Sequence, residues 1–320
     1  MTRGRTRDIT LRSLVLMMGL AVFGCKPSEP GAAGSRLDTA GPGNRPLLVV
    51  CTTGMVADLV RHVGGERVEV DQLMGAGVDP HLYKASPGDI RRLSNADVIF
   101  YSGLHLEGTL TDRFVQFARR KPTFAVTEAL PESRLLTFDE GFADPHVWFD
   151  VLLWSETLDH VAARLAEVDP AHAGEYAARA EAYRKELVVL HEEVKSQLAE
   201  IPRSQRVLVT AHDAFGYFGR AYDVEVRAIQ GISTESEAGV REINELVRFL
   251  VDRKIKAVFV ETSVSNRNIR ALIEGAAQAG QTVKIGGELY SDAMGAPGTP
   301  EGTYIGMIRH NVRTITEALK

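Results

Sequence analysis

Apolar runs and amphipathic segments alternate along the first half of the chain. The runs have the length of strands, and the segments between them repeat apolar residues every three or four positions, as helices do. The strand-like runs cover residues 47–51, 68–74, 98–101 and 124–126, and the helix-like segments cover 55–63, 87–95 and 109–120. Strands that alternate with helices favour a parallel sheet whose two faces are covered by helices.

The middle of the chain is helical throughout. Helical periodicity covers residues 150–167 and then about 171–201, and neither Pro nor Gly occurs between Glu175 and Ile201. About thirty residues of helix would extend about 45 Å, which is longer than the flank of one α/β lobe. One face of the second segment carries apolar residues in steps of three and four: Tyr176, Ala180, Tyr183, Leu187, Leu190, Val194, Leu198 and Ile201. We therefore expect a rigid helix that joins two lobes.

After Pro202 the alternation of strands and helices resumes. The strand-like runs cover 206–210, 224–229, 257–260 and 282–285, and the helix-like segments cover 215–221, 240–253, 269–279 and 303–319. The predicted fold class is α/β, with two lobes, each a parallel β-sheet flanked by helices, joined by one long rigid α-helix. The expected boundaries are 46–168 for the N-terminal lobe, 169–201 for the bridging helix and 202–320 for the C-terminal lobe.

The first 45 residues differ from the rest of the chain. Four arginines precede an apolar run from Leu14 to Phe23, which ends at Gly24 and Cys25. This order is typical of a secretory signal peptide over 1–25, and the run is shorter than the roughly 20 residues that span a bilayer. The end of the run resembles a bacterial lipobox, so we expect lipidation at Cys25, with simple cleavage as the alternative. Residues 26–45, rich in Pro, Gly and Ser, predict a flexible tether. The expected location is extracytoplasmic, in the periplasm or at the cell surface, anchored by the lipid.

Charge and cysteine content exclude several classes of function. Residues 1–25 hold four arginines and one aspartate, so their removal changes the net charge from −5 to −8. An acidic chain is not suited to nucleic acid. Apart from Cys25 only Cys51 remains, inside an apolar run, which predicts a buried small side chain and neither a disulfide nor a thiolate metal site.

Three histidines and one aspartate are candidates for a metal site. The tripeptide Asp-Pro-His occurs twice, ending at His81 and at His146, and its proline holds each imidazole on a stiff corner. His212 follows one strand-like run directly, and Asp292 follows the last. Ligands of parallel α/β sheets bind beyond the carboxyl ends of the strands, so we expect these four residues to meet between the lobes. Three imidazoles and a carboxylate suit zinc, manganese or iron(II), and suit calcium poorly.

Each of these residues also has a plainer explanation. The first two histidines could stabilise turns, His212 could be an ordinary polar residue after a strand, and Asp292 could cap a helix. His105 follows another strand and is a further candidate neighbour of the site. The remaining histidines lie in polar helical segments, where we expect them on the surface: His62, His160, His172, His191 and His310.

Taken together, the motifs resemble one known family, the zinc/manganese-type solute-binding proteins of bacterial ABC importers, also called the TroA-like group or cluster A-I. The resemblance covers the chain from Leu47 onward. It implies two α/β lobes joined by one rigid helix, a metal ion held between the lobes, and delivery of that ion to a membrane permease. The segments that carry it are Val78-Asp79-Pro80-His81, Gly103-Leu104-His105-Leu106-Glu107, Asp144-Pro145-His146-Val147-Trp148, Thr210-Ala211-His212-Asp213-Ala214-Phe215, Gln230-Gly231-Ile232-Ser233-Thr234-Glu235-Ser236-Glu237 and Leu289-Tyr290-Ser291-Asp292-Ala293.

The resemblance places the metal ligands of the family on His81, His146, His212 and Asp292. Relatives with Glu at the third position are typically manganese receptors, so His212 puts this chain in the three-His branch, where zinc and manganese both occur. The His-rich loop and the cysteine pair of many zinc receptors are absent, which weakens an exclusive role for zinc. We expect manganese as the transported ion, with zinc and then iron as alternatives. We expect a monomer. Some members of the family also take part in adhesion to surfaces, so the resemblance includes this as a further function.

Two classes of function remain open on the sequence. The first is a receptor that captures a divalent metal and passes it to the permease, and the second is a secreted metal-dependent hydrolase. A catalytic zinc keeps one position open for water and needs a nearby base. Here four side chains can fill a tetrahedral shell, and no His-Glu-x-x-His helix occurs. Glu261, at a strand end, is the candidate base, with capping or lining of the cleft as its plainer role. We expect the receptor and no enzymatic activity.

Overall fold

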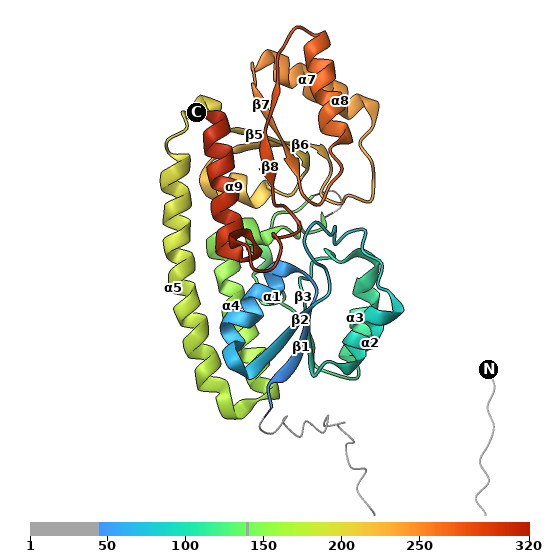
Figure 1. Cartoon of the computed structure of the whole chain (residues 1–320), viewed down its shortest axis with the longest axis vertical. Coiled ribbons are helices and arrows are strands. Elements are labelled where there is room, and N and C mark those ends of the chain that lie inside the picture. The colour runs from blue at the N-terminus through green and yellow to red at the C-terminus, as the bar shows by residue number, and fades with distance from the viewer. Residues whose placement is uncertain (1–44, 139–140) are drawn as a thin grey trace, which may run out of the picture. The chain divides into compact units, whose positions relative to one another are not determined.

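The computed structural model describes residues 45–138 and 141–320. The signal peptide predicted over 1–25, the lipidation site Cys25 and all of the predicted tether except Arg45 lie outside the described residues. Across the described part of the chain, the predicted α/β fold with two lobes and one long connecting helix is confirmed (Figure 1). No helix in that part is both long enough and apolar enough to cross a membrane.

The first lobe is built on a four-stranded parallel sheet in the order β2-β1-β3-β4. The strands are β1 (Leu47–Cys51), β2 (Val68–Gln72), β3 (Val98–Tyr101) and β4 (Thr123–Ala125), and the helices are α1 (Gly54–Gly64), α2 (Pro87–Asn95) and α3 (Thr111–Ala118). Val49, Val50 and Cys51 are all buried, because helices cover both faces of the sheet. The predicted burial of Cys51 is therefore confirmed.

Two helices follow this sheet, α4 (Val151–Val168) and the long α5 (Ala173–Leu198). All the apolar residues predicted on one face of α5 are buried, including Tyr176, Leu187 and Leu198. The last helix, α9 (Tyr304–Leu319), lies beside α5 (Figure 1). The connection between the lobes therefore consists of two helices packed side by side, the second of which comes from the C-terminal end of the chain.

The second lobe holds two pairs of parallel strands, β5 with β6 and β7 with β8, and β5 lies beside β7. The elements are β5 (Val207–His212), α6 (Gly216–Tyr222), β6 (Glu225–Gln230), α7 (Val240–Asp252), β7 (Ala257–Glu261), α8 (Arg267–Gln278) and β8 (Lys284–Leu289). The sequence placed the last strand at 282–285, and that placement was wrong because Gly286 and Gly287 weaken the strand pattern. A side chain at Gly286 would lie 2.8 Å from Ala318 of α9, so glycine is needed where that helix packs on the strand.

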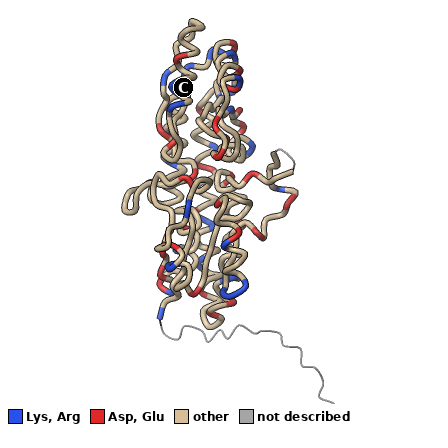
Figure 2. The backbone as a smooth tube through the Cα atoms, turned by 90° about the vertical axis from the view of Figure 1, so that its right-hand side faces the viewer, with Lys and Arg blue, Asp and Glu red and all other residues tan. Residues whose placement is uncertain are grey.

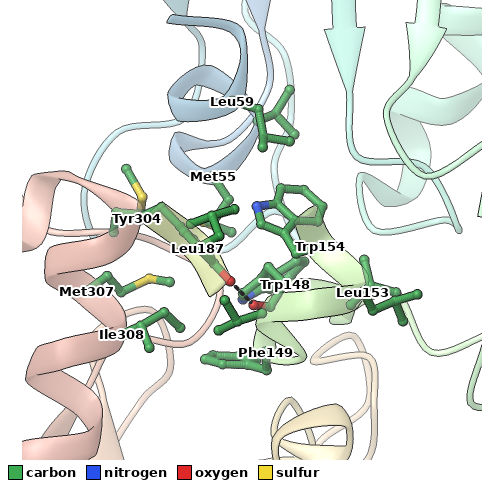
Figure 3. Close-up of a cluster of buried hydrophobic side chains, with 14 of the residues drawn as sticks. Met55, Leu59, Trp148, Phe149, Leu153, Trp154, Leu187, Tyr304, Met307 and Ile308 are labelled. Atoms are coloured by element: carbon green, nitrogen blue, oxygen red, sulfur yellow. Dashed lines mark hydrogen bonds between the residues drawn. The ribbon is translucent and has the colours of Figure 1, made fainter. Parts of the chain in front are cut away.

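The core between the helices also fixes the segment after His146. Trp148, Trp154 and Tyr304 pack together beneath α1, and the Tyr304 hydroxyl donates a hydrogen bond of 2.6 Å to the carbonyl of Trp148 (Figure 3). On its other side, Trp148 Nε1 donates to the carbonyl of Ser291, 3.2 Å away, next to Asp292. One fully buried indole thus connects the segments that carry two of the candidate ligands.

Helices α1, α5 and α9 also share a buried carboxylate. Asp58 of α1 accepts hydrogen bonds from the Tyr183 hydroxyl of α5 at 2.6 Å and from the backbone N–H of Tyr304 in α9 at 3.1 Å. A hydrogen bond to a charged group contributes about 1.5–3 kcal/mol, and leaving such a buried group unpaired costs more. This arrangement resists relative movement of the three helices.

Two histidines that we expected on the surface are buried. His160 of α4 and His191 of α5 are 8% and 9% exposed. The His191 ring packs on Tyr222, and its Nδ1 lies 3.2 Å from the Tyr222 hydroxyl. The surface expectation was wrong for both. Position 191 adjoins the apolar face of α5, and His160 lies among the buried residues of α4, between Leu158 and Val161.

Candidate metal centre

The structure brings together the four residues that the sequence singled out. His81 follows β2, His146 precedes the short helix Val147–Phe149, His212 ends β5 and Asp292 follows β8. One ligand atom from each lies within 4.8 Å of the others. Two of the residues come from each lobe, so the site forms where the lobes meet.

Four of the distances between these atoms are close to the edges of a metal-sized tetrahedron. His81 Nε2 and His146 Nε2 are 3.4 Å apart, and the Asp292 carboxylate lies 3.3 Å from His146 Nε2 and 3.1 Å from His212 Nε2. His81 Nε2 is slightly farther from the carboxylate, at 3.6 Å. Metal–ligand distances of about 2.0–2.2 Å give tetrahedron edges of about 3.3–3.6 Å. Because all four ligand atoms also lie within 4.8 Å of one another, small adjustments of these side chains would bring them around a first-row divalent cation.

Burial leaves several of these atoms without hydrogen-bond partners. His146 and His212 are 0% exposed and Asp292 is 1% exposed. His212 Nε2 and both carboxylate oxygens of Asp292 are buried and make no hydrogen bond. Buried polar atoms without partners raise the free energy of the folded state. A cation bound at the point where these atoms converge would compensate for that cost.

Two further carboxylates orient two of the imidazoles. Asp144 Oδ1 accepts hydrogen bonds from the His146 backbone N–H at 2.9 Å and from His146 Nδ1 at 2.7 Å. Glu261 accepts from the backbone N–H groups of Ala211 and His212 and from His212 Nδ1. In both imidazoles Nδ1 donates and Nε2 is directed at the centre, which is the arrangement that metal-binding histidines require.

The carboxylates also control the protonation of the site. Burial alone would lower the pKa of His146, but Asp144 and Asp292 outweigh it and raise this pKa to about 9. Burial is likewise outweighed at His212, whose pKa is raised well above its ordinary value by Asp292 and Glu261. His81 has no such orienting carboxylate, and burial lowers its pKa to about 4.

Sequence reasoning missed the roles of Asp144 and Glu261. Glu261 was considered as the catalytic base of a hydrolase, but its carboxylate is 3% exposed and occupied by β5 and the His212 ring. It therefore lacks the free oxygen and the access to solvent that activation of a water molecule requires.

The aspartates of the two Asp-Pro-His tripeptides have different hydrogen-bond partners. Asp79 accepts a hydrogen bond from the His81 backbone N–H at 2.9 Å, but its second oxygen accepts from the Thr234 hydroxyl at 2.6 Å. Thr234 belongs to the second lobe and is 7% exposed. This hydrogen bond connects the two lobes directly beside the loop that carries His81.

Replacement of Thr234 by valine should speed up metal release about tenfold or more, because it removes a hydrogen bond to a carboxylate that holds the lobes together. The measurement is stopped-flow release of the bound metal into excess chelator. Ser236→Ala is the matched control. It removes a hydroxyl from the same loop, but at an exposed position. An unchanged release rate for Thr234→Val would show that this hydrogen bond does not limit opening.

His105 lies outside the group of four. It is exposed, has a positive φ of 64°, and lines a cavity of about 440 Å³ together with His81, Phe142 and Glu235. This cavity contains residues of both lobes and meets the centre only at His81, which is the most exposed of the four candidates at 5%. His105 therefore lines the approach to the centre, as the sequence suggested for a neighbouring residue.

Comparison with known proteins agrees with this geometry. A family model described as "ZnuA: Zinc-uptake complex component A periplasmic" matches residues 49–318. The chain is 47% identical over 311 residues to the manganese-binding lipoprotein MntA of Bacillus subtilis (strain 168), covering 97% of this chain and 99% of that protein. It is 28% identical over 320 residues to the metal ABC transporter substrate-binding lipoprotein SloC of Streptococcus mutans, with 98% and 99% covered.

A further relative is matched both by its sequence and by its solved structure. The zinc-binding protein TroA of Treponema pallidum (strain Nichols) is 47% identical over 272 residues, which cover 85% of this chain and 88% of that protein. The solved structure of periplasmic zinc-binding TroA from Treponema pallidum matches with a TM-score of 0.84 and 46% identity, over 86% of this chain and 99% of that one. The resemblance inferred from the motifs is confirmed, and the chain belongs to the ZnuA family, that of the periplasmic component A of zinc-uptake complexes.

Proposed function

We propose that this protein is an extracytoplasmic receptor that binds a divalent transition metal and delivers it to the permease of an ABC importer. The proposed ligands are His81, His146, His212 and Asp292. The observation that carries the proposal is the convergence of four buried side chains whose ligand atoms lie within 4.8 Å of one another. Among these atoms, His212 Nε2 and both oxygens of Asp292 have no hydrogen-bond partner. The names of the relatives, which include manganese-binding, zinc-binding and metal ABC transporter proteins, support the same function.

The alternative, a secreted metal-dependent hydrolase, is not supported. All four metal positions are supplied by side chains that are nearly inaccessible to solvent, and Glu261 is occupied as an orienting group. A hydrolytic centre needs a coordination position for water and a free base. We accordingly propose a transport role without catalysis.

Manganese is the proposed cargo, with zinc as the competing ion and iron as the third. One oxygen of Asp292 lies near His146 and the other lies near His81 and His212, so both can contribute to coordination. A carboxylate that binds through both oxygens raises the coordination number beyond four, which manganese favours more than zinc does. Zinc should nevertheless bind more tightly in vitro, because affinity at such sites rises from manganese towards zinc.

We propose that the mature chain is monomeric and is anchored by a lipid on Cys25. The lipobox-like end of the apolar run supports the anchor, and two relatives bear the name lipoprotein. We also propose the boundaries 46–168, 169–201 and 202–320 for the first lobe, the bridging helix and the second lobe. Because α9 packs along α5, movement between the lobes should be a small tilt rather than a wide closure.

The deciding experiment is metal analysis of the mature protein purified from its native envelope without added metal. We expect about one divalent ion per chain, predominantly manganese, and displacement of that manganese by added zinc. A deletion strain grown with chelator identifies the cargo. Rescue by zinc alone, with manganese uptake unchanged, would show that zinc is transported. A purified protein that carries no metal and takes up neither zinc nor manganese when they are added would contradict the receptor function.

A further inference from the structure

A basic cavity of about 510 Å³ opens between α2 and α3. These two helices lie on the right of the first lobe in Figure 1 and therefore on the side that faces the viewer in Figure 2. Three arginines line it, Arg113, Arg119 and Arg120, together with the apolar side chains of Ile90 and Phe117. No carboxylate is among its lining residues. On a chain with a net charge of −5, this is a local surplus of positive charge.

The three arginines have no partners among the residues that the structure describes. None of them forms an ion pair or donates a side-chain hydrogen bond there, whereas Arg92 on the neighbouring helix pairs with Asp71 and Asp89. Neighbouring guanidinium groups repel one another unless an anion lies between them. The cavity therefore presents several unused donors to an anionic ligand.

Helix-end electrostatics account for only part of this cluster. Arg119 and Arg120 follow the last turn of α3, where cations are stabilised by the helix dipole. Arg113 is the third residue of α3, and a cation in the first turn of a helix is disfavoured by the same dipole. A ligand that needs all three cations explains the position of Arg113, and the dipole does not.

The cavity lies at the amino ends of the strands, and the metal centre lies at their carboxyl ends. Lys121, which follows Arg120, donates hydrogen bonds to the carbonyls of Leu93 and Ala96 at the end of α2. Asp97, the next residue, pairs with Arg45 just before β1. These contacts place the cavity near the amino ends of β1 and β3, where the chain arrives from its N-terminal segment.

We infer that this cavity binds the phosphate groups of anionic phospholipids and so holds the first lobe against the membrane surface. Arginine binds phosphate through paired hydrogen bonds, and the apolar side chains of Ile90 and Phe117 suit the carbons next to a headgroup. The inference rests on the proposed anchor at Cys25. The twenty residues 26–45 have the composition of a flexible tether, and a flexible coil of that length has an average end-to-end distance of about 25 Å.

The membrane contact has a consequence for metal capture. With the amino edge of the sheet on the bilayer, His81 and the approach to the metal centre are turned away from the membrane. The anchored receptor would collect metal in this orientation and would leave the lipid surface when it meets the permease.

The test is vesicle binding by residues 26–320 without the lipid, a chain that retains the whole compact unit 37–320. Vesicles of phosphatidylcholine are compared with vesicles of equal parts phosphatidylcholine and phosphatidylglycerol. We expect binding only to the second kind, weakened by salt. The combined variant Arg113→Gln, Arg119→Gln, Arg120→Gln should lower that binding on the order of 100-fold.

The matched control removes the same charge from the second lobe. Arg248, Arg267 and Arg270 are also exposed and unpaired among the described residues, and their replacement by glutamine should leave vesicle binding unchanged. Equal losses in both variants, or no preference of the wild type for phosphatidylglycerol, would overturn the inference. Binding of inorganic phosphate at the cavity without binding to vesicles would overturn the membrane role and identify a free phosphate ligand.

Metal titration keeps this inference separate from the proposed function. The cavity variant should bind manganese and zinc like the wild type, because none of its substitutions adjoins the metal centre. A wild type that binds anionic vesicles but no metal would contradict the receptor function and leave the lipid site intact.

Discussion

Replacing Asp292 by alanine should reduce the affinity for zinc and for manganese by more than about 100-fold. Removal of a residue that only orients a metal ligand typically costs about 10- to 100-fold, so this loss should be larger. Asp292 is the only candidate that faces all three imidazoles, with one oxygen near His146 and the other near His81 and His212. Its removal leaves the positive charge of the metal without a carboxylate in a site that excludes water. Competition calorimetry with a chelator of known affinity measures the loss.

The histidine variants make the assignment specific. His81→Ala, His146→Ala and His212→Ala should each weaken binding strongly, and His62→Ala and His310→Ala should not. Glu261→Gln should have an intermediate effect of about 10- to 100-fold, because it removes an orienting group and leaves every ligand in place. A variant among His81, His146, His212 and Asp292 that binds metal like the wild type would remove that residue from the ligand set.

The order of the elements could be predicted from the sequence because periodicity reports directly on which positions are buried. Helix α2 begins and ends where the pattern placed it, since Ser86 caps its first turn and Pro87 begins it. Strand β8 was misplaced because glycines give no apolar pattern, although Gly286 is required where α9 packs closely. The burial of His191 was predictable in principle, because it lies beside Leu190 and Val194 on the apolar face of α5.

The candidate centre could be predicted only in part. Strand ends and a repeated tripeptide singled out four residues, but neither could show which carboxylate would orient which imidazole. Glu261 is 49 residues from His212 in the sequence, and only the position of β7 beside β5 in the second lobe brings it to that ring. The two Asp-Pro-His copies have identical sequences, yet Asp144 bonds its own histidine ring and Asp79 bonds Thr234. Tertiary contacts decide that difference.

Metal affinity should rise steeply with pH through the neutral range and continue to rise up to about pH 9. Isolated histidines would confine competition between protons and metal to pH values below about 6.5. In the metal-free centre, Asp144 and Asp292 raise the pKa of His146 to about 9 against the effect of burial, and the pKa of His212 is also raised. Both imidazoles then carry a proton at Nε2 near pH 7. The metal must displace these two protons.

His81 should contribute no proton at neutral pH, because burial lowers its pKa to about 4. Release of about two protons per metal at pH 7 corresponds to an affinity change of about 100-fold per pH unit, and this dependence should weaken as the pH rises through about 9, where His146 loses its proton. Calorimetry in buffers with different ionisation enthalpies counts the released protons. Release of no protons at pH 7 would contradict the charged state of these two histidines.

The same pKa shift fixes the sign of a stability change in the metal-free protein. The folded pKa of His146 lies above its ordinary value, so the stability that this ion pair contributes is fully present below about pH 6.5 and is lost as the pH rises through about 9. Thermal unfolding in the presence of chelator should therefore occur at lower temperature at pH 9 than at pH 6.5. Asp144→Asn removes the carboxylate that accepts the hydrogen bond from His146 Nδ1, so it should flatten this dependence and reduce the protons released on metal binding by about one.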